Sequence, residues 1–507
     1  MNRLTFPQLI VLAALAMLSL LVACLLVPVY AQAQQAPGQP APHITNPPEL
    51  NESRLHRDFR VEAESLKKCA QFNLGGLMDC GQTLVMGQPM HVALGSIAPQ
   101  NGFAAGLAFV EHKNFANELR TSYDMDGVAT LSGSWRAGAY AKLFKQPGGF
   151  TYRPAPLVNL YAQAISLERA DYYGLGPSTP QTAQTTFGFR EQIYGASAII
   201  PTSGALHTLG VIFVGEIDGR IPSLRAGSSD AIPSIETLFT DATAPGLARQ
   251  PATLQAGLGV RLVPVMPRVP FSINYLGRID QFAAPGDSAY SFRRFTARFD
   301  HHIPLYNLLP VRARAAYYKS AAPVIQYHGP DDCTAATSSR NIDPQHAVHA
   351  SDAVPCPVPG ATRQLEGSID LGVYITQNFA GAGSRVPFYF MPTLGGSDVN
   401  GAGALSSYPD YRFRGPDTFL LRGSIEHSLG HWPIGAAFTV DEGKVGMARS
   451  DIGFSHLRHT FAAGLTLRAG GLPVVSLLFA WGGNEGHHTT AAVSPTLLGG
   501  SSRPSLY

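Results

Sequence analysis

The stretch TFLLRGSIEHSL, residues 418–429, decides the fold. One set of alternate positions along it holds Phe, Leu, Gly and Ile, and the other set holds Leu, Arg, Ser and Glu. Successive side chains of a β-strand point to opposite faces, so this segment predicts a strand with one apolar face and one charged face. Such a strand suits a position between lipid and water, as in a membrane barrel.

The stretch FRRFTARFDHHI, residues 292–303, has the same two-faced pattern. Its phenylalanines alternate with Arg294 and Arg298, and in the stretch 310–318 Arg312 and Arg314 alternate with small apolar residues. If the apolar faces meet lipid, these four arginines lie on the inner side of the barrel. Charges of both signs on that side predict an interior that holds water.

The composition supports a chain made of many such strands. It is 45% hydrophobic but only 14% charged, it contains 52 glycines, and beyond its first residues it has no run of about 20 apolar residues that could form a spanning helix. Sixteen strand-like segments occur from residue 88 onward; residues 310–321 form the eleventh, and residues 368–377 are assigned to a loop. We predict an all-β, transmembrane, antiparallel β-barrel of about sixteen strands with a short N-terminal amphipathic helix. A soluble, β-rich secreted protein is the alternative.

The N-terminal part divides by composition. Residues 1–33 carry Arg3, a long apolar stretch and a small-residue pattern, which predict a secretory signal peptide, although Cys24 also fits the acylation site of a lipoprotein. Residues 34–50 form a linker rich in proline and glutamine, and residues 51–87 hold the amphipathic helix and a cysteine loop. Residues 88–507 are the predicted barrel, which places the protein in the bacterial outer membrane.

Long connections are expected on one side of this barrel. With sixteen strands and both termini in the periplasm, residues 173–184, 220–251 and 322–417 all fall on the extracellular side, where barrels of this class carry their long loops. The last of these connections includes an unusually long insertion. A loop of that length is normally functional or disordered.

Four cysteines lie beyond the predicted signal peptide. Cys69 is close in sequence to Cys80, and Cys333 is close to Cys356. In an exported chain an even number of cysteines at short range predicts two local disulfides. No histidine stands at ligand spacing beside either pair, so we predict neither a metal nor another cofactor. The net charge of +2 gives no reason to expect a nucleic-acid partner.

The sequence carries no recognisable catalytic motif. It lacks a G-x-S-x-G elbow, an H-E-x-x-H helix and a P-loop. The adjacent histidines His301 and His302 point to opposite faces of a strand, so they do not form a ready site. We therefore expect a protein that is not an enzyme.

Several pieces of the chain resemble, in their order, the bacterial surface-antigen barrel of the outer membrane protein 85 superfamily. They include ADYYGLGPST (170–179), IPSIETLFTDATAPGL (232–247), YSFRRF (290–295), VPFYFMPTLGGS (386–397), SYPDYRFRG (407–415) and the strand 418–429. The resemblance implies a sixteen-stranded barrel whose sixth outer loop folds back into the lumen. There an Arg-Gly-aromatic tip meets acidic residues on the strands that follow, since a guanidinium group pairs with a carboxylate through two parallel hydrogen bonds.

Carried onto this chain, the resemblance makes Glu426 and Asp441 the acidic partners of the loop. The tip departs from the family pattern, because residues 405–408 read Leu-Ser-Ser-Tyr, and only Tyr408 keeps the aromatic position. The nearby stretch Arg412, Phe413, Arg414 and Gly415 supplies substitutes. An alternative is that Glu426 and Asp441 are ordinary lumen carboxylates that balance the arginines.

Family members that handle proteins also carry periplasmic POTRA modules, and no such module fits before residue 88. The resemblance still implies a role in inserting or exporting proteins at the outer membrane. The implied partners are outer-membrane lipid, unfolded outer-membrane or exported proteins, and a periplasmic partner that supplies docking modules. The alternative is a passive channel or a surface structural barrel with a loop that plugs its lumen.

Overall fold

The structure is a computed structural model. It describes residues 89–115, 119–145, 156–264, 271–306, 365–398, 403–429, 434–469 and 472–493, except positions 228, 230 and 484, together with a few positions between 59 and 67. The chain divides into two units, Met1–Val92 with Leu308–Gln326, and Ala93–Asn307 with Tyr327–Tyr507. The account below concerns the second unit.

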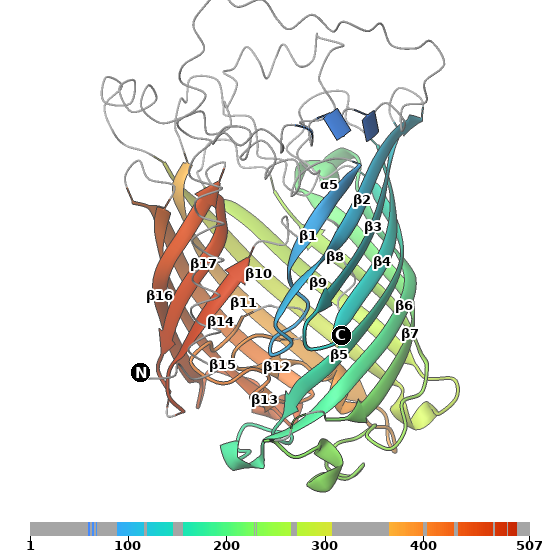
Figure 1. Ribbon diagram of the computed structural model, residues 1–507, viewed down its shortest axis with the longest axis vertical. Coiled ribbons are helices and arrows are strands. Elements are labelled where there is room, and N and C mark those ends of the chain that lie inside the picture. The colour runs from blue at the N-terminus through green and yellow to red at the C-terminus, as the bar shows by residue number, and fades with distance from the viewer. Residues whose placement is uncertain are drawn as a thin grey trace, which may run out of the picture. The chain divides into compact units, whose positions relative to one another are not determined.

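Strands dominate the described residues (Figure 1). They are β1 (Met90–Ser96), β2 (Phe103–Phe115), β3 (Leu119–Thr130), β4 (Trp135–Lys145), β5 (Leu157–Tyr172), β6 (Thr185–Pro201), β7 (Val211–Ala226), β8 (Thr253–Leu262), β9 (Ser272–Ala283), β10 (Phe292–Tyr306), β11 (Leu365–Ala380), β12 (Thr393–Leu394), β13 (Phe413–Arg414), β14 (Asp417–Ser428), β15 (Ile434–Gly446), β16 (Arg458–Ala469), β17 (Leu472–Trp481) and β18 (His488–Val493). Short helices are η3 (Gln181–Ala183), α5 (Gly204–Thr208), η4 (Ile235–Thr237), η5 (Ser288–Tyr290), η7 (Phe388–Phe390) and η8 (Arg449–Asp451).

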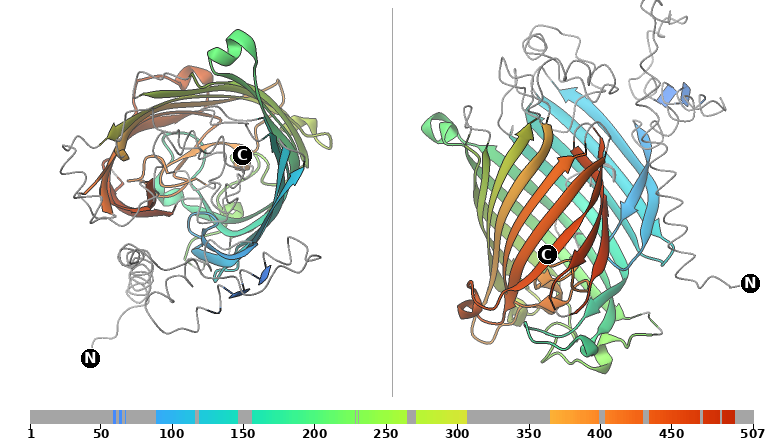
Figure 2. Two further views of the ribbon diagram at one scale, coloured as in Figure 1. Left: turned by 90° about the horizontal axis from the view of Figure 1, so that it is seen from above. Right: turned by 90° about the vertical axis from the view of Figure 1, so that its left-hand side faces the viewer.

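One 16-stranded sheet runs in the order β1 to β11 and then β14 to β18, and β12 pairs with β13 in a separate two-stranded sheet. The pairs along the large sheet are antiparallel, as between β10 and β11 and between β11 and β14. Figure 2 shows this sheet curling round, with chain segments inside the curve. The predicted all-β fold of about sixteen strands is therefore confirmed.

The assignment of residues 368–377 to a loop was wrong. They lie in β11, which pairs along its length with β10 and with β14. Apolar residues recur at positions 369, 371, 373 and 375, so the segment has the two-residue period of a strand. This period was passed over when the segment was assigned to the long loop. The predicted strand at 310–321 lies outside the described residues.

This correction changes the place of the long insertion. Tyr306 at the end of β10 pairs with Leu365 at the start of β11, whereas Phe292 pairs with Ala380 at the other end of the sheet. The connection 307–364 therefore joins the sheet at the end opposite to the connection 381–416. The prediction that residues 322–417 form a single outer loop was wrong, because β11 crosses the whole sheet between its two parts.

The end that carries connection 381–416 is called here the loop end, and it is the lower end in Figure 1. It also carries the connections 173–184, 227–252, 284–291, 447–457 and 482–487. The predicted N-terminal helix and all four cysteines fall almost entirely outside the described residues, so the helix and the disulfides remain predictions. Among the helices that the structure describes, none has the length and apolarity needed to cross a membrane.

Side chains alternate between the two faces of the sheet. In β8, Leu254, Leu258 and Val260 are exposed on the outer face, while Thr253 and Gln255 are buried on the inner face. Exposed apolar side chains continue round the outer face; examples are Leu160, Ile217, Ile279, Phe299, Leu371, Ile425, Phe438, Leu465 and Leu477. The inner face is polar and carries ion pairs such as Arg220 with Asp218 and Arg136 with Asp126.

An outer face that lies in lipid makes a specific prediction at Leu258, whose side chain is 77% exposed. Leu258→Arg should destabilise the protein by about 2–4 kcal/mol in lipid vesicles, because an arginine near the bilayer centre is expensive. Denaturant unfolding of vesicle-reconstituted protein measures this value. Leu238→Arg, at an exposed leucine in the connection 227–252 of the loop end, is the control and should cost little. Equal small effects of both changes would mean that water covers the outer face.

Candidate functional site

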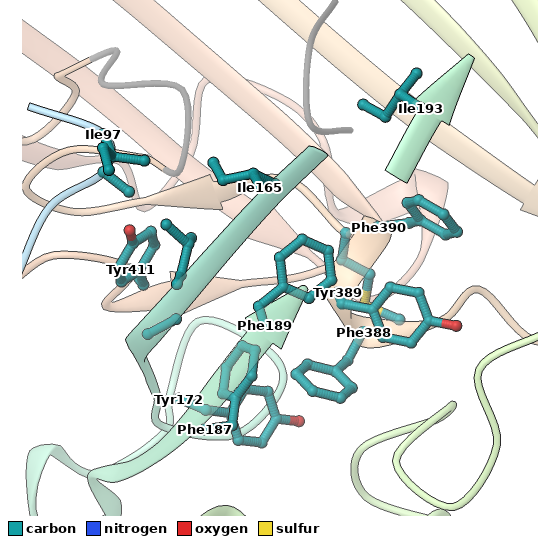
Figure 3. Close-up of a cluster of buried hydrophobic side chains, with 14 of the residues drawn as sticks. Ile97, Ile165, Tyr172, Phe187, Phe189, Ile193, Phe388, Tyr389, Phe390 and Tyr411 are labelled. Atoms are coloured by element: carbon teal, nitrogen blue, oxygen red, sulfur yellow. The ribbon is translucent and has the colours of Figure 1, made fainter. Parts of the chain in front are cut away.

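The connection 381–416, which the structure describes at 381–398 and 403–416, packs in those parts against the inner face of the sheet and is called here the plug loop. Its aromatic turn η7 places Phe388, Tyr389 and Phe390 in the main buried cluster (Figure 3). There the Phe388 ring lies 4.9 Å from Tyr172 of β5 and 5.2 Å from Phe187 of β6. The plug loop is thus fixed to the wall by ordinary apolar packing.

Two glycines let the plug loop fold back on itself. Gly395 and Gly396 have φ values of 107° and 60°, which favour glycine. A Cβ atom on Gly396 would lie 2.3 Å from Oδ1 of Asp410, so a side chain has no room there. The fold-back pairs β12 with β13, and it places Arg414 of β13 and the preceding Arg412 in the interior.

Arg412 is the most completely coordinated side chain of the plug loop. Its guanidinium group donates to both carboxylate oxygens of Glu485, at 2.6 and 2.7 Å, and to the carbonyl and hydroxyl oxygens of Thr179, at 2.6 and 3.0 Å. The same group stacks on the rings of Tyr173 and Phe413, at 4.9 and 4.7 Å. The side chain is only 2% exposed. Arg412 therefore joins the plug loop to the β5–β6 connection and to the β17–β18 connection.

Arg414 holds the aromatic turn of the plug loop. Its Nη1 donates to the carbonyl oxygens of Phe388, at 2.9 Å, and Met391, at 3.4 Å. The carbonyl oxygen of Arg414 accepts from the backbone N–H of Gly176 at 2.7 Å. Gly415 follows directly and donates its N–H to Pro392.

Phe413 lies against two guanidinium groups. Besides Arg412, Arg458 of β16 lies over this ring, 4.2 Å from its centroid, and donates to the carbonyl oxygen of Pro177 at 2.6 Å. Tyr408 is buried and meets the edge of the Phe413 ring at 5.1 Å. The predicted tip residues Tyr408, Arg412, Phe413 and Arg414 are thus brought together in the interior.

The two predicted acidic partners have different surroundings. Asp441 accepts from the backbone N–H of Leu405 in the plug loop at 2.9 Å and pairs with Arg422 at 2.7 and 2.8 Å. Arg422 also donates to the carbonyl oxygen of Gly403. Asp441 therefore contacts the plug loop both directly and through Arg422.

Glu426 lies farther along β14, away from the plug loop. It accepts from Thr466 at 2.8 Å and pairs with Arg468 of β16. These contacts fit the alternative of a lumen carboxylate that balances an arginine. The geometry favours Asp441 over Glu426 as the acidic residue that positions the loop.

The predicted lumen arginines divide in the same way. Arg294 is buried, donates to Asn378 at 2.9 Å and to the carbonyl oxygen of Phe390, and so contacts the plug loop. Arg298 is half exposed and lies 3.3 Å from Asp300 and 5.0 Å from the ring of Tyr374. Arg312 and Arg314 lie outside the described residues.

Sequence reasoning missed the partners that complete this site. Glu485 and Thr179 lie 73 and 233 residues from Arg412. Glu485 belongs to no motif, and although Thr179 ends the stretch 170–179, nothing in that stretch marks it as a partner of Arg412. The missed Arg422 was visible in the strand 418–429, but its pairing with Asp441 depends on the β14–β15 register. The strand register could therefore have predicted the pairing of Arg422 with Asp441. No feature of the sequence predicts the contact between Glu485 and Arg412.

No family model matches the chain, and no curated protein matches it. Among solved structures it is similar to CdiB from Acinetobacter baumannii, with a TM-score of 0.43 and 10% identity over 79% of this chain and 59% of that one. It is also similar to CdiB from Escherichia coli, with a TM-score of 0.43 and 11% identity over 79% of this chain and 61% of that one. A third similar structure is BamA from Haemophilus ducreyi lacking POTRA domains 1-3, with a TM-score of 0.42 and 9% identity over 80% of this chain and 70% of that one. The chain thus spans about three fifths of each CdiB chain. Likenesses at this level establish no function.

The Arg412 contacts generate one prediction. Arg412→Ala leaves the carboxylate of Glu485 buried without its cation, and breaking a buried pair in this way costs about 3–5 kcal/mol. The plug loop should therefore detach, so that protease cleaves it faster in the reconstituted protein. Arg249→Ala is the matched control, because that arginine is 79% exposed and lies 3.8 Å from Asp287. Unchanged cleavage in Arg412→Ala would contradict the assignment.

The acidic residues generate a second prediction. Asp441→Asn removes a charge that holds both Leu405 and Arg422, so amide hydrogens in residues 403–415 should exchange at least tenfold faster, as for loss of a charged hydrogen bond worth about 1.5–3 kcal/mol. Glu426→Gln should leave the same amides unchanged. Hydrogen exchange read by mass spectrometry compares the two variants, and equal effects would show that Asp441 has no special part in holding the loop.

Proposed function

We propose that this chain is an outer-membrane β-barrel that acts in the insertion or export of proteins, with the plug loop as its closing element. The observation that carries the proposal is the pair of Arg412 with Glu485, because Glu485 stands in the connection 482–487 that leads into β18. One buried ion pair thus joins the loop that fills the interior to the hairpin at the edge of the sheet.

The outer-membrane location is supported by the two faces of the sheet. The outer face carries exposed apolar side chains on many strands, and the inner face carries buried ion pairs. In water, so much exposed apolar surface would promote aggregation, whereas in a bilayer the acyl chains of the lipids cover it. The long connections 173–184, 227–252 and 381–416 at the loop end support an extracellular position for that end.

The edge hairpin supports a role in handling other strands. β18 stands last in the strand order and pairs with β17 through the register from Val475–Val493 to Ala480–His488. Such an edge strand presents backbone N–H and C=O groups that can pair with an incoming strand. In the proposed mechanism, displacement of the plug loop breaks the Arg412 pair and frees the hairpin, while a periplasmic partner delivers the unfolded protein.

A passive channel needs a continuous aqueous path. Here the aromatic turn η7 and Arg412, Arg414 and Tyr408 are all buried within the interior at the loop end. These contacts favour a closed barrel over an open pore. They do not require any cofactor or bound metal.

Depletion of the protein in its native host tests the proposal. We expect several unrelated outer-membrane or surface proteins to fall in abundance while their precursors accumulate in the periplasm, as measured by quantitative proteomics of both fractions. A copy carrying Arg249→Ala should restore them, and a copy carrying Arg412→Ala should restore them less well. Loss of this protein alone would overturn the proposal and favour a channel or structural role.

A further inference from the structure

The outer face of β5, β6 and β7 changes character at one level near the loop end. Going toward that end, the outward side chains of these neighbouring strands are first apolar, with Leu160, Tyr194, Ile217 and Ile221 all exposed. Beyond Gln192, which lies opposite Ile221, the outward positions Ser166, Arg190 and Ser223 lie opposite one another across the three strands. Figure 1 shows these long strands side by side, reaching toward the loop end.

Arg190 is the free cation of this row. Its neighbours Phe189 and Glu191 are buried on the inner face, whereas Arg190 is exposed, so its side chain points outward. Within the part of the chain that the structure describes, no carboxylate pairs with it. An exposed guanidinium directly above an apolar surface is placed to meet an anionic group at the boundary of a bilayer.

A second guanidinium lies diagonally across from Arg190. Arg225 of β7 is opposite Gly188, two residues from Ser223, and such diagonal neighbours lie about 7–8 Å apart. Because Gly188 has no side chain, Arg225 crosses over β6 and reaches β5. There it pairs with Glu168 at 3.0 Å and donates to the hydroxyl oxygen of Ser166 at 2.9 Å.

The net charge of this surface is positive. Glu168 is its acidic member and already has Arg225 as a partner, which leaves the charge of Arg190 uncompensated. Polar groups that can donate to an anion surround it, namely the exposed hydroxyl of Ser223 and the side chain of Gln192, which accepts from the Tyr194 hydroxyl at 3.0 Å. Arginine binds phosphate through paired N–H groups, which suits it to this position.

We propose that Arg190, with Arg225 and Ser223, binds the phosphate of a glycolipid in the outer leaflet, while the apolar surface formed by Leu160, Tyr194, Ile217 and Ile221 receives the acyl chains. A molecule with a phosphorylated headgroup and several chains matches both halves of this surface at once. The inference rests on the proposed outer-membrane location and on the loop end facing outward. The proposed roles of the plug loop and the edge hairpin do not depend on this ligand.

The test uses the full chain in detergent micelles and bisphosphorylated lipid A as the probe. Native mass spectrometry should show lipid A retained by the unchanged protein, about tenfold weaker retention by Arg190→Gln, and partial retention by Arg190→Lys, as expected for loss of one charged hydrogen-bonding group. Arg249→Gln is the matched control and should bind like the unchanged protein. Dephosphorylated lipid A should bind weakly to all four proteins.

Two results would overturn the site. One is equal retention of bisphosphorylated lipid A by Arg190→Gln and the unchanged protein. The other is equal retention of phosphatidylglycerol and lipid A, both lost in Arg190→Gln, which would mean a site for any anionic lipid. Insertion of the protein into vesicles, detected by its heat-modifiable mobility on a gel, separates the proposed outer-membrane role from the proposed glycolipid site. Failure of the unchanged protein to insert counts against the outer-membrane role, whereas normal insertion with unaltered lipid A binding counts against the glycolipid site alone.

Discussion

The buried guanidinium group of Arg412 sets the arrangement of the loop end. A charge that is 2% exposed is costly to remove from water, and the cost is offset only if its hydrogen bonds are satisfied. Here a carboxylate, a carbonyl, a hydroxyl and two aromatic faces come from three separate connections of the sheet. These contacts therefore fix the three connections relative to one another.

The wall of the sheet uses the same principle with different partners. Arg220, which is 1% exposed, pairs with Glu191 and Asp218 and donates to Gln255, so it ties β6, β7 and β8 together on the inner face. Tyr161 of β5 extends this network by donating to Asp218 and to Glu216. Inward charges on other strands are paired as well, such as Arg136 with Asp126 and Arg468 with Glu426. These contacts join strands across the inner face, whereas the outer face is mainly apolar up to the level of Arg190 and Ser223.

The strands could be predicted from the sequence because their pattern is local. Two-residue alternation in 292–303 and 418–429 identified β10 and β14 directly, whereas a loop folded into the interior was implied only by the family resemblance that 386–397 and 407–415 carry. β11 was missed because a second alternating stretch with arginines, at 310–318, took its place in the count. The partners of Arg412 could not be predicted at all. Glu485 lies 73 residues beyond Arg412, and their contact depends on how β14 to β17 pair and on how the plug loop folds back, which no periodicity in the chain predicts.

The length of β5, β6 and β7 has a consequence for the solvent that surrounds the plug loop. These strands have 16, 17 and 16 residues, and their outward side chains become polar from Ser166, Arg190 and Ser223 toward the loop end. Tyr172 and Phe187, against which Phe388 packs, lie still closer to that end. In the proposed outer-membrane position, the apolar core under the plug loop would therefore be flanked by water and not by acyl chains. In that position its cohesion would come from the ordinary hydrophobic effect, which urea weakens, and not from contact with lipid.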